Sequence, residues 1–279
     1  CSCIMPCGKV KALPPDAPAQ FGGAIGEFEF RATLDRTEAA VNDAVTAYFP
    51  FPTPVCAPHL GEPQEGLMAD TTWIDTRRHN GGIIELSLNG GPVNALSPEK
   101  LMGFRDVIQQ LGADDAVRAI VLTSPLKVFS AGLNLKEAQD FDDDAQIAIV
   151  NGLNEGFLAQ YACPKPVICA IGGAAIAGGL FFVLASDHRI ATPKALFGLA
   201  EVRVGVDFPV GPFEIARATL STNELRRLIL RGQPIKAEAA MSAGIVDRIV
   251  APEDLRTEAL KDAAEFASIP PKAFAAIKQ

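Results

Sequence analysis

Short apolar runs bounded by turn residues recur along this chain, and each of them predicts a buried strand. The runs that predict strands are 83–88, 119–124, 166–171, 187–191, 195–198 and 244–250. Their short length distinguishes them from the longer segments between them, in which apolar residues recur with helical spacing.

Helices are predicted between and after these strands. In the first, over 97–111, Ser97 is the expected N-cap and Pro98 occupies the first helical position. The others are expected at 145–161, 211–220, 223–231, 236–242 and 252–267, with a last one starting near Pro271. Strands that alternate with helices favour an α/β fold built on mostly parallel sheets.

The stretch 170–182 joins two of these elements through small residues. The strand at 166–171 ends in it, and an apolar helix is expected to continue to Leu184. Gly178 and Gly179 would lie in the first turn of that helix, where backbone N–H groups have no intrahelical partner. Because glycine has no side chain, a ligand can approach this backbone closely. Small residues would equally suit a strand and a helix that pack closely, so both interpretations stay open on this stretch alone.

A second small-residue loop, 129–135, follows the predicted strand at 119–124. The N–H groups of Leu133 and Gly178 are therefore candidates for an oxyanion hole, a pair of donors that stabilises a negatively charged oxygen. This chemistry requires the two loops to converge, a point that their sequences leave open.

The first 67 residues differ in composition from the remainder. Nine of the 21 prolines lie there, a helix is predicted at 34–48, and 49–66 is typical of a linker. We therefore expect an N-terminal extension of unassigned role over 1–67, a core over 68–210 and a helical C-terminal region over 211–279.

Composition and charge exclude several classes of protein. The net charge of −8 argues against a nucleic-acid-binding surface and against a basic membrane-binding face. No apolar run reaches the roughly 18–20 residues that a membrane-spanning helix needs.

The cysteines indicate a reducing compartment. Cys163 and Cys169 fall in apolar segments and are predicted to be buried thiols. Cys1, Cys3 and Cys7 lie close together, but no second cysteine or histidine pair follows at ligand spacing, so we predict no metal site.

Five segments carry a resemblance to a known family. They are 92–97 (Pro-Val-Asn-Ala-Leu-Ser), 128–135 (Val-Phe-Ser-Ala-Gly-Leu-Asn-Leu), 166–179, 186–191 and 197–201. In this order and at this spacing, the chain from about Gly82 to its end resembles the crotonase superfamily, the enoyl-CoA hydratase/isomerase family. The resemblance covers none of 1–67. It implies a crotonase-type spiral of ββα units with a helical C-terminal trimerisation region.

The resemblance also implies an acyl-CoA thioester as substrate, with no further cofactor and no metal. The thioester oxygen would lie between the N–H groups of Leu133 and Gly178. The CoA and acyl moieties would lie along Ala95, Leu96, Ala131, Gly132, Leu135, Gly179 and Phe181. The family forms homotrimers or hexamers. The expected location is cytoplasmic for a bacterial protein, and mitochondrial or peroxisomal for a eukaryotic one.

The carboxylates of the site distinguish the reactions of the family. Hydratases of the family resemble one another in having two glutamates; the first position is Phe181 here and the second is Glu201. Hydration calls for two groups that position and activate water, whereas one base can move a proton between two carbons of one substrate. The pattern is therefore most similar to that of the mitochondrial-type Δ3,Δ2-enoyl-CoA isomerases, which act in fatty acid β-oxidation.

In the mechanism that this resemblance implies, Glu201 removes a proton from C2 of a 3-enoyl-CoA and returns it to C4. The charge of the dienolate would be stabilised by the two N–H groups. Phe181, Phe182 and Phe208 are expected to surround the carboxyl group, to raise its pKa by desolvation and to exclude water.

Two alternatives stay open. The first is an enoyl-CoA hydratase or another lyase of the family that uses a second group, for which Asp207 is the nearest candidate in the sequence. The second is a catalytically silent member of the family that binds acyl-CoA.

Overall fold

A computed structural model describes residues 69–138 and 140–278 of the chain. The strands and helices of these residues run from Ile74 to Lys278. The N-terminal extension over 1–67, with its predicted helix at 34–48, lies outside the described residues.

The larger of the two sheets has six strands in the order β1-β2-β3-β5-β7-β10. Their bounds are β1 Ile74–His79, β2 Ile83–Leu88, β3 Ala119–Thr123, β5 Val167–Ile171, β7 His188–Ala191 and β10 Arg248–Ile249. All neighbours are parallel except β1 and β2, which confirms the mostly parallel sheet. β1 was not predicted, because Ile74 is its one buried residue and the apolar signal is absent. β10 is shorter than the predicted strand at 244–250.

A second sheet of four strands lies beside the first, in the order β4-β6-β8-β9. The strands are β4 Val128–Ser130, β6 Ala174–Ile176, β8 Leu196–Gly198 and β9 Ile235–Lys236. β6 lies in a segment that we expected to be loop. Three residues, two of them alanines, carry too little periodicity to predict a strand.

The two sheets are built by a repeated unit. β3 and β4, β5 and β6, and β7 and β8 are consecutive pairs, with the first strand of each pair in the larger sheet and the second in the smaller. Each pair is followed by a helix: α3 Leu135–Ala138, α5 Gly178–Leu184 and α6 Glu201–Val204. The chain therefore advances as a series of ββα units, and each unit places a loop at the same edge of the smaller sheet.

α2 (Pro98–Ala113) begins where Ser97 and Pro98 predict, with the Ser97 hydroxyl accepting from the Lys100 N–H. α4 (Asp143–Tyr161) begins two residues before the expected 145 and is capped by the Asp142 carboxylate. The remaining elements are the short helix η1 Asn80–Gly82 and the helices α7 Val210–Thr219, α8 Thr222–Arg231, α9 Ala237–Ser242, α10 Leu255–Ser268 and α11 Pro271–Lys278.

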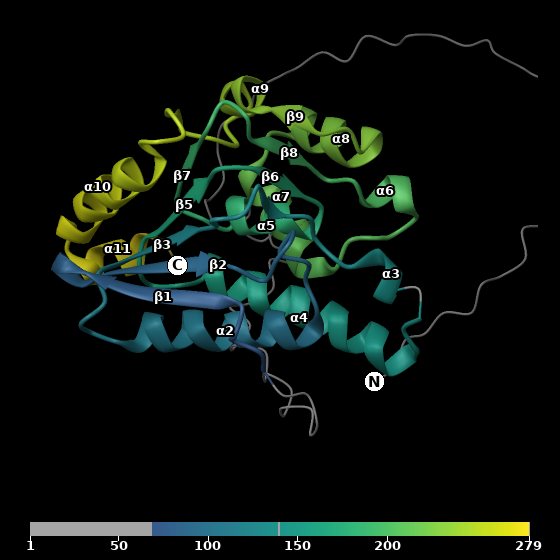
Figure 1. Cartoon of the computed structure of the whole chain (residues 1–279), viewed down its shortest axis with the longest axis horizontal. Helices are drawn as coiled ribbons and strands as arrows, with labels where there is room; N and C mark the ends of the chain where they lie inside the picture. Colours follow the sequence, from purple (N-terminus) through teal and green to yellow (C-terminus); the bar gives the residue numbers. More distant parts are fainter. Residues whose placement is uncertain (1–68, 139, 279) are drawn as a thin grey trace, which may run out of the picture. The chain divides into compact units, whose positions relative to one another are not determined.

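Helices cover both faces of the larger sheet. Figure 1 shows α2 and α4 along one side of it and α10 on the other. The α10 side is a small core in which Leu255 packs with Val121 and Ile168. The α2 and α4 side holds the main core. α7 packs on α4 and α5, so helices from the region 211–279 contribute to the same core as the strands. The division at 210/211 stays a prediction.

An aromatic cluster occupies the centre of the main core. The Phe182 ring lies with its centroid 5.0 Å from that of Phe104 and 4.9 Å from that of Phe157, in edge-to-face geometry. All three side chains are fully buried. Rings in this arrangement contribute beyond the area that they bury, so Phe182 anchors α5 to α2 and α4.

We expect Phe182→Ala to lower the free energy of unfolding by about 3–5 kcal/mol, because it removes this ring and leaves a cavity. Leu230→Ala, at a largely exposed position on α8, is the matched control and should change it by less than about 0.5 kcal/mol. Urea denaturation at constant pH measures both. Equal effects of the two substitutions would contradict the central place given to Phe182.

Candidate active site

The two small-residue loops meet. Gly132 has φ +78°, and a Cβ placed on it would lie 2.9 Å from the backbone nitrogen of Gly178, closer than side chains approach backbone. The Leu96 N–H donates to the Gly132 carbonyl oxygen at 2.9 Å, and the Ala131 N–H donates to the Val93 carbonyl oxygen at 3.0 Å. Three segments distant in sequence are therefore held together: 93–96, 131–133 and the start of α5.

The backbone N–H groups of Leu133 and Gly178 are available at this junction. Within 69–138 and 140–278, neither donates a hydrogen bond to another protein group. Both residues line the same cavity. The two loops therefore converge, and both donors can serve a bound molecule.

Ala177 shapes the approach to Gly178 through an unusual backbone. Its φ of 51° and ψ of −129° lie in a region that favours glycine and costs about 1–3 kcal/mol for other residues. A 2.7 Å hydrogen bond from its N–H to the Gly198 carbonyl oxygen holds it there. The peptide that carries the Gly178 N–H is thus fixed on one side by strand β8.

Gly179 has a packing role. A Cβ on it would lie 2.3 Å from the Ser130 carbonyl oxygen, so only glycine lets α5 pack this closely on β4. Gly179 is absent from the lining of the cavity and of the groove beside it. Of the two glycines, only Gly178 lines the cavity. The close-packing interpretation holds for Gly179, and ligand binding at Gly178 stays a prediction.

The cavity at the junction has a volume of about 170 Å³. Its lining is apolar except for two carboxyl groups, and it consists of Ala131, Leu133, Leu153, Ile176, Ala177, Gly178, Phe181, Ala200, Glu201, Val204, Val206, Asp207, Pro209 and Pro212. The predicted Leu133, Gly178, Ala131, Phe181 and Glu201 are all among these residues. Leu153, Val204, Val206 and Pro212 were missed, because in the sequence an apolar pocket residue is indistinguishable from a core residue.

The three phenylalanines expected around Glu201 have different positions. Phe181 lines the cavity and is 2% exposed. Phe208 lies behind it, with its ring centroid 6.3 Å from that of Phe181. Phe182 was expected at the pocket, and this was wrong: on α5 it points into the main core. Successive residues of a helix cannot share one face.

Glu201 is buried without a partner for its charge. The side chain is 8% exposed, and its Oε2 has no hydrogen-bond partner among the residues that the structure describes. Desolvation by burial raises the pKa of this carboxyl group to about 7, opposed in part by a hydrogen bond from its own backbone N–H. At neutral pH the group is therefore close to half ionised, so that it can both accept and donate a proton.

A groove of about 880 Å³ adjoins the cavity and shares Ala131 and Leu133 with it. It holds the predicted Ala95 and Leu96. The predicted Gly132 is buried and lines neither the groove nor the cavity. The predicted Leu135 begins α3 at the end of the same loop. The groove also holds Lys100, which the sequence did not single out and whose Nζ donates to the Ala95 carbonyl oxygen at 3.1 Å.

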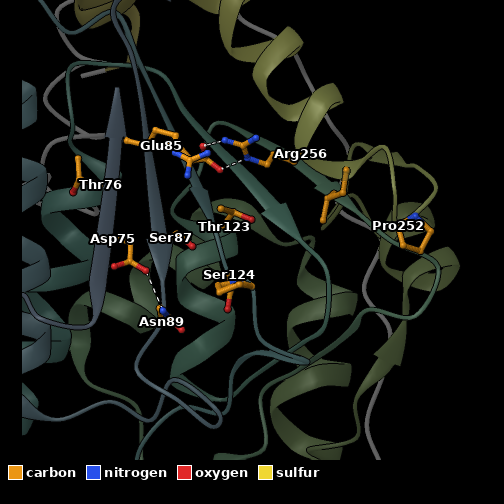
Figure 2. Close-up of a pocket in the computed structure, with 12 residues that line it drawn as sticks. Asp75, Thr76, Glu85, Ser87, Asn89, Thr123, Ser124, Pro252 and Arg256 are labelled. Carbon is orange, nitrogen blue, oxygen red and sulfur yellow. Dashed lines mark hydrogen bonds and ion pairs between the residues drawn. The ribbon is translucent and has the colours of Figure 1, made fainter. Parts of the chain in front are cut away.

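A separate depression of about 570 Å³ lies between the outer part of the larger sheet and α10. Figure 2 shows its polar side chains, with Glu85 paired to Arg256 through two hydrogen bonds of 2.7 and 2.6 Å. The Arg256 guanidinium, and more weakly His79, holds the pKa of the Glu85 carboxyl group below its ordinary value. The Glu85–Arg256 pair joins α10 to β2, and its two charges compensate each other.

Three further sequence predictions concern membrane helices, metal ligands and cysteines. No helix in 69–138 and 140–278 has the length and apolar character to cross a membrane, and no group of three or more potential metal ligands occurs there. Cys163 and Cys169 are buried free thiols, as predicted. Cys1, Cys3 and Cys7 lie outside the described residues.

The sequence model of the enoyl-CoA hydratase/isomerase family matches residues 78–279. The chain belongs to this family. It is 30% identical over 202 residues to the putative enoyl-CoA hydratase/isomerase YngF of Bacillus subtilis, covering 72% of this chain and 77% of YngF. It is 33% identical over 209 residues to the probable enoyl-CoA hydratase EchA17 of Mycobacterium tuberculosis, covering 71% of this chain and 76% of EchA17.

Comparison with solved structures supports the same family assignment. Pseudomonas aeruginosa DspI superimposes with a TM-score of 0.70 at 31% identity, covering 77% of this chain and 88% of DspI. The crotonase-type α/β fold predicted from the sequence is confirmed. The family match begins within β1, at Arg78, and reaches the end of the chain, so both the cavity and the groove belong to the family's fold.

The burial of Glu201 predicts a pH-dependent stability. The carboxyl pKa is about 7 in the folded chain and near its ordinary value of 4.5 in the unfolded chain. Burying the ionised form therefore costs nothing below about pH 4.5, and the cost is fully present above about pH 7. We expect Glu201→Gln to raise the free energy of unfolding by up to ~3 kcal/mol at pH 8.5, and far less at pH 4.5.

Denaturant unfolding of both proteins at the two pH values measures this difference. Gln109→Ala, at an exposed position on α2, is the control: it removes no ionisable group and should leave the pH dependence unchanged. A gain that is the same at both pH values would show that the carboxyl group of Glu201 is not desolvated.

Proposed function

We propose that this protein is a Δ3,Δ2-enoyl-CoA isomerase, which converts a 3-enoyl-CoA to the 2-trans-enoyl-CoA in fatty acid β-oxidation. The observation that carries the proposal is the pair of residues at the cavity: Glu201 is a buried carboxyl group with a pKa of about 7, and Phe181 faces the same space. One proton-transferring group beside an apolar wall suits a proton shift between two carbons better than the addition of water.

The thioester carbonyl oxygen would accept hydrogen bonds from the N–H groups of Leu133 and Gly178. This role is supported by their position on one cavity and by the absence of a protein acceptor for either group among the described residues. When C2 loses its proton, negative charge moves to this oxygen, where fixed donors are most effective. Loss of one such donor typically lowers the rate by about 10²–10³-fold.

Glu201 would remove the C2 proton and return it to C4. A base is most effective when its pKa lies near the working pH, because it is then both ionised often enough to accept the proton and acidic enough to release it. The burial of Glu201 supplies that pKa. Phe181 would limit the access of water to the dienolate, which favours return of the proton over hydration.

The groove would hold the CoA moiety, with Ala95, Leu96 and the loop from Ala131 to Leu135 along its wall. This part of the proposal rests on the continuity of groove and cavity through Ala131 and Leu133. We also propose that the reaction needs no bound cofactor, since the two N–H groups and one carboxyl group supply each step. By analogy with its family, the protein would assemble as a homotrimer or hexamer.

A hydratase is the second candidate, and Asp207 is the observation that favours it. Its side chain lines the same cavity as Glu201, and its Oδ1 accepts from the Phe208 N–H at 2.7 Å. A second carboxyl group could hold water against C3 of a 2-enoyl-CoA. The name of EchA17 points the same way for that relative. A catalytically silent acyl-CoA-binding protein is the third candidate, and it would bind through the same cavity and groove.

Two substrates separate these candidates. The protein is incubated with 3-hexenoyl-CoA and with crotonyl-CoA, and each product is followed by chromatography. Isomerisation of the first without hydration of the second is the expected result. Hydration of crotonyl-CoA at a comparable rate would favour the hydratase, and binding without turnover of either would favour the silent protein.

We expect Glu201→Gln to lower kcat for 3-hexenoyl-CoA by about 10²–10⁴-fold, because it removes the proton-transferring group. Binding of hexanoyl-CoA should be retained, since glutamine preserves the shape of the side chain. Asp207→Asn is the matched comparison and should lower kcat by less than tenfold. If Asp207→Asn were as damaging as Glu201→Gln, the single-base mechanism would be wrong.

A further inference from the structure

We propose that the cavity beside Glu201 selects acyl groups of about six carbons and excludes long unbranched chains. This inference rests on the proposed function only in taking the ligand to be an acyl thioester. It concerns the shape of the cavity, and the reaction performed at Glu201 does not enter it.

The volume of the cavity sets the size of the group that fits. At about 170 Å³ it is only slightly larger than an apolar protein cavity of roughly 150 Å³ that binds one benzene ring. Six carbons therefore nearly fill it. A ten-carbon acyl chain requires either a wider cavity or an exit for its end.

Phe181 forms one wall, and the core behind it prevents the ring from moving aside. The Phe181 centroid lies 5.5 Å from that of Phe157, which is itself 4.9 Å from that of Phe182. Phe157 and Phe182 are both fully buried. Interiors packed at this density do not yield space for several methylene groups without a cost to stability.

The part of the wall that α7 supplies is also held in place. Pro209 and Pro212 line the cavity at the start of α7, and proline rings have little freedom to adapt. The Gly211 N–H donates to the Asn154 side-chain oxygen on α4 at 2.8 Å, which fixes the start of α7 to the helix that carries Leu153. The cavity is therefore bounded by two packed helices.

The side toward the exposed end of α6 suits an apolar chain poorly. Val204, Val206 and Asp207 line this side and are exposed. A long acyl chain leaving here would lie against the Asp207 carboxylate and remove water from it, which is unfavourable. A short acyl chain ends before it reaches Asp207 and avoids this cost.

Isothermal titration with saturated acyl-CoAs tests this selection without requiring turnover. Butanoyl-, hexanoyl- and decanoyl-CoA are titrated into the full chain. We expect hexanoyl-CoA to bind most tightly and decanoyl-CoA about tenfold or more weakly, since a group that does not fit a rigid pocket loses at least this factor. Phe181→Ala should tighten decanoyl-CoA relative to hexanoyl-CoA by about tenfold or more.

Phe104→Leu is the control, because it loosens the same aromatic cluster without reaching the cavity, and it should keep the wild-type order. Should Phe181→Ala fail to fold, Leu153→Ala enlarges the cavity from the other side and should shift the preference in the same direction. Decanoyl-CoA binding as tightly as hexanoyl-CoA to the wild type would overturn the inference, and so would a failure of all three ligands to bind.

The failures of the two proposals are distinguishable. Tight binding of hexanoyl-CoA without isomerisation of 3-hexenoyl-CoA would remove the proposed reaction and leave the size selection intact. Isomerisation of 3-hexenoyl-CoA with equal binding of decanoyl- and hexanoyl-CoA would support the proposed reaction and remove the size selection.

Discussion

The contact between Gly132 and the start of α5 is the constraint on which the site depends. A Cβ at Gly132 would lie 2.9 Å from the Gly178 nitrogen, and the φ of +78° disfavours other residues, so the close approach of the two loops calls for glycine there. Their meeting brings the Leu133 and Gly178 N–H groups to one cavity and opens the groove beside them. The strained backbone of Ala177 belongs to the same arrangement, because strand β8 fixes it through Gly198. The repeated ββα unit makes this possible by placing successive loops at one edge of the smaller sheet.

The second feature on which the site depends is the burial of the Glu201 carboxyl group without an ion-pair partner among the described residues. Elsewhere in the described part of the chain, buried acids are paired: Glu85, for instance, is held by Arg256, which lowers its pKa. Among the described residues Glu201 has no such partner, and burial moves its pKa in the opposite direction. The burial of the ionised carboxyl group lowers the free energy of unfolding above neutral pH. In the proposed mechanism, the same burial gives the base a pKa close to the working pH. Phe181 lines the same cavity and adds an apolar wall to it.

Much of the fold was predictable, because apolar runs and capping residues mark elements that are buried or clearly bounded. Ser97 and Pro98 located the start of α2, and the runs at 83–88 and 119–124 gave two central strands. Edge strand β1 escaped prediction because one of its residues is buried, and β6 because it is short and alanine-rich. At the site, small residues and one acid were visible in the sequence. The wall residues Leu153 and Pro212 were not, because only the tertiary fold decides whether an apolar side chain faces the core or a cavity.

The proposed mechanism depends most on Glu201 acting as a base whose pKa is set by burial. The pH dependence of kcat/KM for 3-hexenoyl-CoA tests this most directly, because it reports the ionisation of groups in the free enzyme. If Glu201 is this base, kcat/KM rises between pH 5 and 8 with one apparent pKa near 7, where the carboxyl group loses its proton. An activity that is constant over this range, or that is fully developed already at pH 5, would contradict it.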